Sequence, residues 1–451
     1  MSPCGDIRTA IPGPRSQALR AEEAAYLAPG TQGVSQLAGL AFDHGTGALL
    51  TDVDGNTFVD FVAGICVASL GHGHPALGAA LGEQAAKFAA GSFTSAPRVE
   101  LLQRIGALAS DITPGSKLKR TQLYSGGAEA VESALRLARS YTKKYEVVAF
   151  WGGFHGKTGG VLGLMGSDFK HGLGPLPTGQ HLAPYADCYR CPLQMSYPKC
   201  GLACVDFLRQ LIRFNTTGSL AAIIVEPIQG TNGNVVPPAD WLPAVKSVAH
   251  EFGALLVLDE MITGFGRTGK MFGASHYGVE ADIMTFGKGV ASGYPLTGVI
   301  STDEIVRAEP WSKPSFSSSS YGGGALGAAA GNAVTRAIVE EKLDENAAAV
   351  GAAMLAELEL IKERYPFVGD VRGKGLMVAI DLVKDKKTKE PLDKRTCEWI
   401  FQECLERGLL TMAYAPRIRI NPPLNITRAQ ALAGVAVIDE VFGKLVQRGW
   451  T

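Results

Sequence analysis

The sequence predicts an α/β fold in which a mostly parallel central sheet is joined to a smaller α+β domain. Short apolar runs alternate with amphipathic helical patterns through the middle of the chain, and this alternation is typical of a parallel sheet covered by helices on both faces. The chain has 451 residues, 55 glycines and a hydrophobic content of 46%, which suit a large core and many tight turns.

The elements are expected in the following order. Residues 1–35 form an arm with one helical turn at residues 16–26, and residues 47–64 alternate around an Asp-Gly turn as a β-hairpin does. A helix begins near Pro75, because proline is favoured in the first helical turn. Strands are then expected at TQLYSG, EVVAFW, AAIIVEP, ALLVLDE and DIMTFG.

A second domain is expected from the two ends of the chain. One helical pattern runs from Ala325 to the neighbourhood of Arg364, and strands follow at VRGKGLMVAIDLV and IRINPPL. We therefore predict an N-terminal arm with part of the small domain over residues 1–75, a large domain over residues 76–330, and a C-terminal small domain over residues 331–451.

Charge and hydropathy limit the partners of the chain. Its 43 basic and 43 acidic residues give no net charge, so nothing favours nucleic acid. No apolar run approaches the ~20 residues that cross a bilayer, and the N-terminal segment lacks the apolar centre of a signal peptide. We expect a cytoplasmic protein that binds neither nucleic acid nor a membrane.

Four of the eight cysteines lie close together in the segment CYRCPLQMSYPKCGLAC. Cys188, Cys191, Cys200 and Cys204 form a CxxC pair and a CxxxC pair, which is one way to hold a zinc ion through thiolates. The primary expectation is a reduced surface loop without a metal, because no flanking pattern fixes the geometry of the ligands.

Residues 255–300 place an acid and a lysine at the ends of two predicted strands. Asp259 ends the apolar run LLVL, and Lys288 follows the run Ile283–Phe286 between two glycines. Ligands of open α/β sheets bind at the carboxyl ends of the strands. A lysine there suits a Schiff base with pyridoxal phosphate (PLP), and an acid suits the pyridinium nitrogen of that cofactor. We therefore predict Asp259 and Lys288 as catalytic and cofactor-binding residues.

Two motifs in this region are those of one enzyme family. DEMITGFGRTGKMF matches the signature D-E-x-x-x-G-x-G-R-T-G, and FGKG with PLTGV matches a lysine segment. Over roughly residues 35–445 the chain resembles the class III aminotransferases, which are fold-type-I PLP enzymes, near the 4-aminobutyrate and ω-amino acid branch.

The resemblance implies further contacts with the cofactor. The phosphate-binding turn of the family corresponds to Ser125, Gly126, Gly127 and Ala128, with Gly126 in place of the usual hydroxyl residue. Phe154 of the F-H-G motif would stack on the pyridine ring, and His155 would either orient this loop or contact the cofactor. The cofactor side of the pocket is expected to include Glu226, Gln229 and Ile262.

The resemblance also implies an assembly of two chains. Ser319 and Ser320 match the family's S-T-Y-G-G element, whose hydroxyl residue reaches the phosphate of the neighbouring subunit. We expect a homodimer or a dimer of dimers with shared active sites. Near the N-terminus, Ile65 and Cys66 fall where the family narrows its amine pocket.

The candidates for substrate recognition are cationic. Arg419 in APRIRINPPL matches the arginine that binds the substrate α-carboxylate in the family, and Arg417 on the same side of the strand is the alternative. Lys157 replaces the arginine that follows F-H-G in 4-aminobutyrate and ornithine-type members. Thr231 replaces the glutamate that pairs with the C-terminal arginine in those members.

The sequence thus predicts a PLP-dependent aminotransferase that moves an amino group from an ω-amino acid or related primary amine to a keto acid, pyruvate or 2-oxoglutarate. The alternative is a PLP-dependent amino-acid racemase or epimerase, because both reactions use the same cofactor residues and differ in where the proton returns.

Overall fold

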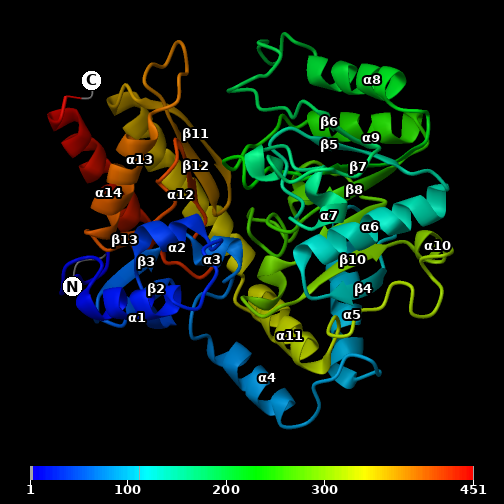
Figure 1. Ribbon diagram of the computed structural model, residues 1–451, viewed down its shortest axis with the longest axis horizontal. Helices are drawn as coiled ribbons and strands as arrows, with labels where there is room; N and C mark the ends of the chain where they lie inside the picture. Colours follow the sequence, from blue (N-terminus) through cyan, green and yellow to red (C-terminus); the bar gives the residue numbers. More distant parts are fainter. Residues whose placement is uncertain (1–3, 111, 450–451) are drawn as a thin grey trace. The chain divides into compact units, whose positions relative to one another are not determined.

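The computed structural model describes residues 4–110 and 112–449 and confirms an α/β protein with a mostly parallel central sheet (Figure 1). These residues form two compact units. The larger unit spans Ala76–Asp344, and the smaller unit combines the residues up to Pro75 with those from Glu345 onward.

A seven-stranded sheet forms the centre of the larger unit. Its order is β4 (Arg120–Tyr124), β10 (Thr297–Ser301), β9 (Ile283–Phe286), β8 (Leu255–Asp259), β7 (Leu220–Val225), β5 (Glu146–Phe150) and β6 (Gln180–Ala183). The strands from β9 to β6 are parallel, whereas β10 is antiparallel to both of its neighbours. Every residue of β5, β7, β8 and β9 is buried, which explains why these strands are apolar in sequence except for Glu146, Asp259 and Thr285.

The helices of the larger unit are α4 (Pro75–Ala85), α5 (Ala96–Ser110), α6 (Gly127–Thr142), α7 (Gly159–Leu162), α8 (Ala203–Asn215), α9 (Trp241–Glu251), α10 (Asp303–Val306) and α11 (Ala325–Glu340). Three short 3-10 helices accompany them: η1 (Asp168–Lys170), η2 (Gly273–His276) and η3 (Lys288–Ala291). Helices α5, α6, α8 and α9 pack against strands of the seven-stranded sheet, whereas α4 lies apart from it (Figure 1).

Helix α6 begins beside the ends of two central strands. It packs across β7, β8, β9 and β10 through its apolar face, and Glu129 in its first turn and Arg139 in its last complement the helix dipole. Two antiparallel pairings separate β4 from β9, so β4 runs in the same direction as β8 and β9. Helix α6, which follows β4, therefore begins at the edge of the sheet where β8 and β9 end.

The smaller unit contains two short sheets. One has the order β1 (Phe42–Thr46), β2 (Leu49–Asp52), β3 (Thr57–Asp60) and β13 (Leu409–Leu410), and the other has the order β11 (Val368–Lys374), β12 (Met377–Leu382) and β14 (Arg417–Ile420). Its helices are α1 (Pro14–Ala24), α2 (Gly33–Ala38), α3 (Ala63–Cys66), α12 (Leu343–Arg364), α13 (Lys394–Leu405) and α14 (Arg428–Gln447). The hairpin expected around the Asp-Gly turn is β2 and β3.

Several details differ from the sequence prediction. The single helical pattern from Ala325 to Arg364 is wrong, because Lys342 adopts a left-handed backbone conformation (φ 51°) and separates α11 from α12. Strands β6 and β10 were not predicted, since QHLA is short and TGVIS is interrupted by glycine. Within residues 4–110 and 112–449, no helix combines the length and apolar composition that crossing a bilayer requires.

Candidate functional site

Asp259 and Lys288 lie at the carboxyl ends of two neighbouring parallel strands. Asp259 is the last residue of β8 and is 2% exposed, and it is in register with Thr285 of β9. The Thr285 hydroxyl donates to Asp259 Oδ1 at 3.2 Å. Lys288 begins η3, two residues beyond the end of β9, and is half-buried. Since β8 and β9 are parallel, the acid and the lysine lie at the same edge of the sheet.

The carboxylate of Asp259 is held from several directions. His155 Nδ1 lies 2.7 Å from Oδ2, and the backbone N–H of Met261 donates to Oδ1 at 3.1 Å. Burial opposes a charge on His155, but the hydrogen bond and the negative charge of Asp259 raise the pKa of the imidazole. The bond from His155 fixes the orientation of the buried carboxyl group. The same bond joins the loop after β5 to the end of β8, and both expected roles of His155 stay predictions.

The backbone around Lys288 is tightly constrained. Lys288 itself has φ 43°, a left-handed conformation that is rare for residues other than glycine. A Cβ atom at Gly287 would lie 2.6 Å from Met261 Sδ and 2.8 Å from Thr297 Cγ2, so only glycine fits before the lysine.

Met261 and Thr297 also join the lysine loop to the first turn of α6. The Thr297 hydroxyl donates to the Gly126 carbonyl at 3.0 Å, and Met261 Sδ lies 3.6 Å from the position of a Cβ at Gly127. Sequence reasoning missed both residues, because their contacts join segments far apart in the chain. The structure thus brings Asp259, the Lys288 loop and the predicted phosphate turn together.

The first turn of α6 presents backbone donors. Glu129 Oε2 accepts hydrogen bonds from the N–H groups of Ser125 at 3.1 Å and Gly126 at 3.2 Å. Among the described residues, no acceptor bonds the N–H groups of Gly127 and Ala128, which lie at the positive end of the helix dipole. Of the four residues expected at a phosphate, Gly127 and Ala128 therefore have their donors available.

Glu226 ties together the loops that follow β5 and β7. It is 5% exposed; its Oε1 accepts from the N–H of Phe154 at 3.0 Å, and its Oε2 accepts from the N–H of Gly230 at 3.0 Å. Burial raises the pKa of Glu226. The Ile262 side chain occupies the space that a Cβ at Gly230 would need. The half-buried Phe154 is thus positioned through Glu226.

A second buried acid, Glu260, was missed although it lies within the D-E motif. Its carboxylate accepts hydrogen bonds from the N–H groups of Gly273 at 2.8 Å and Ala274 at 2.7 Å, and from the Thr263 hydroxyl. These bonds close the loop after β8 onto η2. We assign Glu260 a structural role, because both carboxylate oxygens are bonded within this loop.

The candidates for specificity in the larger unit are more exposed. Lys157 is exposed. Thr231 is half-buried and directly follows Gly230, whose N–H donates to Glu226. Gln229 is buried, and its side-chain amide donates to the Trp151 carbonyl at 2.9 Å. Ser320 is exposed, and the Ser319 hydroxyl accepts from the N–H of Gly322 at 3.2 Å.

The two candidate arginines lie on β14 in the smaller unit. Arg417 Nε lies 3.3 Å from Oδ2 of the fully buried Asp381, with which it is paired across β12 and β14. Arg419 is half-buried, and no ion pair to it occurs within the part of the chain that the structure describes. This difference favours Arg419 over Arg417 as a ligand of a carboxylate. In the same unit, Ile65 and Cys66 belong to a turn with φ of 66° and 65°.

The cysteine segment does not have the arrangement of a zinc site. In residues 4–110 and 112–449, no group of three or more His, Cys, Asp or Glu side chains is placed to hold a metal ion. All eight cysteines are free thiols, and burial raises the pKa of Cys204 to about 11. The zinc alternative for Cys188, Cys191, Cys200 and Cys204 therefore finds no support among the described residues.

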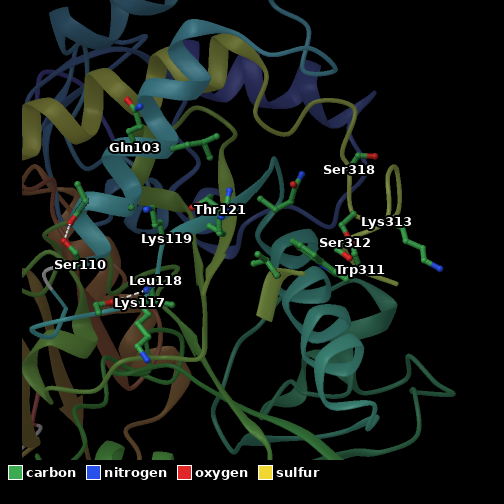
Figure 2. Close-up of a pocket in the computed structure, with 18 of the residues that line it drawn as sticks. Gln103, Ser110, Lys117, Leu118, Lys119, Thr121, Trp311, Ser312, Lys313 and Ser318 are labelled. Carbon is green, nitrogen blue, oxygen red and sulfur yellow. Dashed lines mark hydrogen bonds between the residues drawn. The ribbon is translucent and has the colours of Figure 1, made fainter. Parts of the chain in front are cut away.

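A large cavity lies elsewhere in the larger unit. It measures about 880 Å³ and lies between α5, β4 and the loop at residues 306–318 (Figure 2). Figure 2 shows Lys119 and Thr121 on one side of it and the Trp311–Lys313 segment on another. None of the predicted cofactor residues lines this cavity, so its size does not identify it as the site of the chemistry.

Comparisons with known proteins identify the family of the chain. The sequence model of the family described as "Aminotransferase class-III" matches residues 31–442. The 5-aminovalerate aminotransferase of Pseudomonas putida is 34% identical over 92% of this chain and 96% of its own length. The leucine/methionine racemase of Thermococcus litoralis is 33% identical over 88% of each chain.

The fold agrees as well. An amine transaminase from an uncultivated Pseudomonas species, solved with PLP bound, superposes with a TM-score of 0.86 and 31% identity. The superposition covers 93% of this chain and 98% of that one.

Proposed function

The chain belongs to the class III aminotransferases, and from this premise we propose that it transfers the amino group of an ω-amino acid or related primary amine to a keto acid, pyruvate or 2-oxoglutarate. Members of this family depend on PLP, and a related transaminase structure holds that cofactor. The observation that carries the proposal is the placement of Asp259 and Lys288 at one sheet edge, beside the open donors of α6.

The residues at this edge fit PLP. The N–H groups of Gly127 and Ala128 suit its phosphate, the Asp259 carboxylate suits its ring nitrogen, and the Lys288 amine suits its aldehyde. Phe154 offers an aromatic face for the ring. When bound, PLP supplies an electron sink for the charge that remains on the substrate carbon after a proton leaves.

The side chains of this protein supply the remaining steps. We assign Lys288 Nζ the removal of the proton from the amine-bearing carbon of the substrate and its later return, as general base and acid. Asp259, held by His155, Met261 and Thr285, keeps a proton on the cofactor ring nitrogen. Met261 and Thr297 keep Lys288 in register with the phosphate turn.

For the carboxylate of the substrate we propose Arg419, because its guanidinium lacks the acid partner that Arg417 has in Asp381. A planar guanidinium makes two parallel hydrogen bonds to a carboxylate. Lys157 is proposed as a second cation for substrates that carry a distal carboxylate. Ile65 and Cys66 remain proposed neighbours of the amine.

A second function, amino-acid racemisation, is favoured by the identity of 33% to the leucine/methionine racemase. The two activities differ in where the proton returns, and a simple experiment separates them. An enantiopure amino acid is incubated with the holoenzyme without a keto acid. Loss of optical rotation without loss of amine indicates a racemase, and no change supports the transaminase.

We propose that the protein acts as a homodimer. The structure describes every residue of α4. None of these residues is buried, although the helix is mostly apolar. Tyr321 is 84% exposed and Phe93 is 72% exposed. Apolar surface of this kind is typical of an interface, and Ser319 and Ser320 lie next to Tyr321. Light scattering should give twice the chain mass, or four times for a dimer of dimers. The cytoplasmic location stays a prediction.

A screen of amine donors tests the proposed function directly. Purified holoenzyme is mixed with ω-amino acids, α-amino acids and simple amines, with pyruvate or 2-oxoglutarate as acceptor. The proposal predicts formation of alanine or glutamate with at least one ω-amino acid. The proposal fails if no donor yields either product.

A further inference from the structure

The cavity beside β4 takes no part in the proposed reaction. It measures about 880 Å³ and is bounded by α5, the edge strand β4 and the loop at residues 306–318 (Figure 2). Small-molecule sites of proteins usually measure roughly 300–1,000 Å³. None of the residues proposed for PLP or for the substrate lines this cavity. Its size and its separate walls therefore suit a second ligand.

The cavity is surrounded by positive charge. The charged side chains among its described lining residues are Lys117, Lys119, Arg120 and Lys313, with no acid among them. Arg120 pairs with Asp303 at 2.6 Å, and Lys313 pairs with Glu309 at 3.2 Å. The charges of these two cations are therefore partly offset by acids that do not line the cavity.

Lys117 and Lys119 lack an acid partner. Within residues 4–110 and 112–449, neither ammonium takes part in an ion pair. The carboxylate of Glu280 accepts from the backbone N–H of Lys117 and, at 2.9 Å, from the Ser116 hydroxyl, rather than from an ammonium. Two lysines on one short segment without an acid partner favour an anion beside them.

Strand β4 adds polar groups that lack partners. The Thr121 hydroxyl is buried, and no group of the described residues bonds it. In the described sheet β4 is the last strand, so no strand pairs with the side of its backbone that faces away from β10. Figure 2 shows Thr121 and Lys119 on the same side of the cavity. A buried hydroxyl without a partner is costly, and a ligand that accepts its hydrogen bond removes this cost.

Other parts of the walls are apolar. Leu102 of α5, Leu118 and Trp311 line the cavity, and Leu118 and Trp311 are themselves 2% and 9% exposed. Small-molecule sites combine mostly apolar walls with a few polar groups that fix the orientation of the ligand. The lining therefore suits a ligand that carries an anionic group on an apolar body.

The wall formed by residues 311–317 is held in place by its own hydrogen bonds. The Tyr124 hydroxyl donates to the Ser317 carbonyl at 2.8 Å, and Trp311 Nε1 donates to the Ser133 hydroxyl at 3.1 Å. The Ser317 hydroxyl donates to the Trp311 carbonyl at 2.8 Å. Because Tyr124 belongs to β4 and Ser133 to α6, the loop is fastened to both elements. A preformed wall lowers the entropy that a ligand must overcome when it binds.

We propose that this cavity is a binding site for a small organic anion, a phosphate or a carboxylate on an apolar body. The Lys117 and Lys119 ammonium groups and the Thr121 hydroxyl bind the anionic group, and the apolar wall around Trp311 contacts the body. The proposal is independent of the reaction at Lys288, since the two sites share no residue.

Isothermal titration calorimetry of the holoenzyme tests the proposal with simple probes. Naphthyl phosphate and naphthoate carry an anion on an apolar body, naphthalenemethanol is the neutral body, and inorganic phosphate is the anion alone. At least one naphthyl anion should bind at least about fivefold more tightly than naphthalenemethanol or phosphate, as expected for one or two exposed charge pairs. The naphthyl anion that binds more tightly identifies the preferred anionic group. The absorbance of PLP should stay unchanged during the titration, because the two sites are separate.

Three variants locate the bound anion. The double variant Lys117→Gln and Lys119→Gln should weaken binding of the naphthyl anion at least about fivefold and leave naphthalenemethanol unchanged. Thr121→Val should weaken it about two- to tenfold through loss of one hydrogen bond. Ala107→Phe, at an exposed position of α5 that lines the cavity, fills the space with a ring and should abolish binding.

Lys387→Gln and Ala24→Phe are the matched controls, because both residues are exposed and belong to the smaller unit. Both control variants should bind the naphthyl anion as the wild type does. Thermal midpoints near that of the wild type show that each variant is folded. If Ala107→Phe does not fold, the double lysine variant decides, since it changes only exposed side chains.

Four results would overturn the proposal. The first is a wild-type protein that binds neither naphthyl anion, and the second is equal affinity for the anions and for naphthalenemethanol. The third is unchanged binding of the anion in the double lysine variant or in folded Ala107→Phe, which would place the ligand elsewhere. The fourth is a change in the absorbance of PLP that follows the binding curve, which would place the anion at the cofactor.

Discussion

The ends of β8 and β9 differ sharply from the loops around Lys157. Asp259 is 2% exposed and receives hydrogen bonds from His155, Met261 and Thr285. Lys157 is exposed, and its ammonium rests on two aromatic rings. In the first region several hydrogen bonds fix the carboxylate of Asp259, whereas in the second the Lys157 ammonium contacts only aromatic rings among the described residues, at 4.6 and 5.9 Å.

This difference separates the residues that we propose for the chemistry from Lys157, which we propose for the choice of substrate. Buried, hydrogen-bonded groups are costly to change, because removing one partner leaves the others unsatisfied. Exposed positions such as Lys157 tolerate substitution at small cost to stability. We expect substitutions in the first region to lower kcat and substitutions in the second to change KM.

The largest effect is expected for Lys288→Ala, which removes the proposed proton carrier at the substrate carbon. Turnover should fall below detection, while PLP still binds through its phosphate and ring contacts. Stopped-flow absorbance of the cofactor with a saturating amine provides the measurement. Lys270→Ala, in the same part of the chain, is the matched control, because Lys270 is exposed and its side chain donates to the Ser275 carbonyl at 3.2 Å, away from the proposed site. An equal loss of turnover in Lys288→Ala and Lys270→Ala would contradict a specific catalytic role for Lys288.

Asp259→Asn should lower kcat by about 10²–10⁴-fold, the range for loss of a positioned charged group. The amide keeps the shape of the carboxylate but no longer holds a proton on the ring nitrogen. Binding of PLP should weaken far less than kcat, as titration of the apoenzyme would show. A kcat near that of the wild type would mean that another group sets the electronics of the ring.

Arg419→Ala and Arg417→Ala should separate binding from stability. Arg419→Ala should weaken use of the keto acid at least about 30-fold, the equivalent of losing a bidentate pair, and should leave simple amines unaffected. Arg417→Ala leaves the buried Asp381 with one partner fewer and should lower the thermal midpoint instead. Single-turnover kinetics and thermal unfolding of both variants provide the test. The reverse pattern would make Arg417 the carboxylate ligand.

The smallest effect is a pH dependence of stability at two buried glutamates. Burial raises the pKa of Glu226 above 4.5, so the wild type loses stability as the pH rises from 4.5 through the folded-state value. Glu226→Gln has no carboxyl group to ionise at this position, so it does not lose this stability. Its thermal midpoint should therefore rise relative to that of the wild type as the pH rises.

Glu146 provides the matched opposite case. Burial opposes ionisation there, but hydrogen bonds from Thr217 and neighbouring groups lower the pKa of the carboxyl below 4.5. The ionised Glu146 carboxylate contributes fully to the stability of the fold above pH 4.5. This contribution is lost as the pH falls through the pKa of Glu146 in the folded state. The thermal midpoint of Glu146→Gln should therefore lie below that of the wild type, and this difference should become smaller only at acidic pH. Parallel pH profiles for the two variants would contradict these assignments.

Much of the fold could be predicted because buried parallel strands leave a clear pattern. The runs before Asp259 and Lys288 are buried and apolar except for Thr285, and their ends mark the edge of the sheet. The break at Lys342 could not be predicted, because a left-handed lysine has no distinct sequence pattern. Nor could the contacts of Met261 and Thr297, which depend on loops brought together by the sheet.

The most direct test of the account is to identify the lysine that holds the cofactor. Holoenzyme is reduced with borohydride, digested and mapped by mass spectrometry. The placement of Lys288 after β9, between Gly287 and Gly289, predicts a single phosphopyridoxyl group on Lys288. An adduct on any other lysine would contradict the assignment of the site and the mechanism built on it.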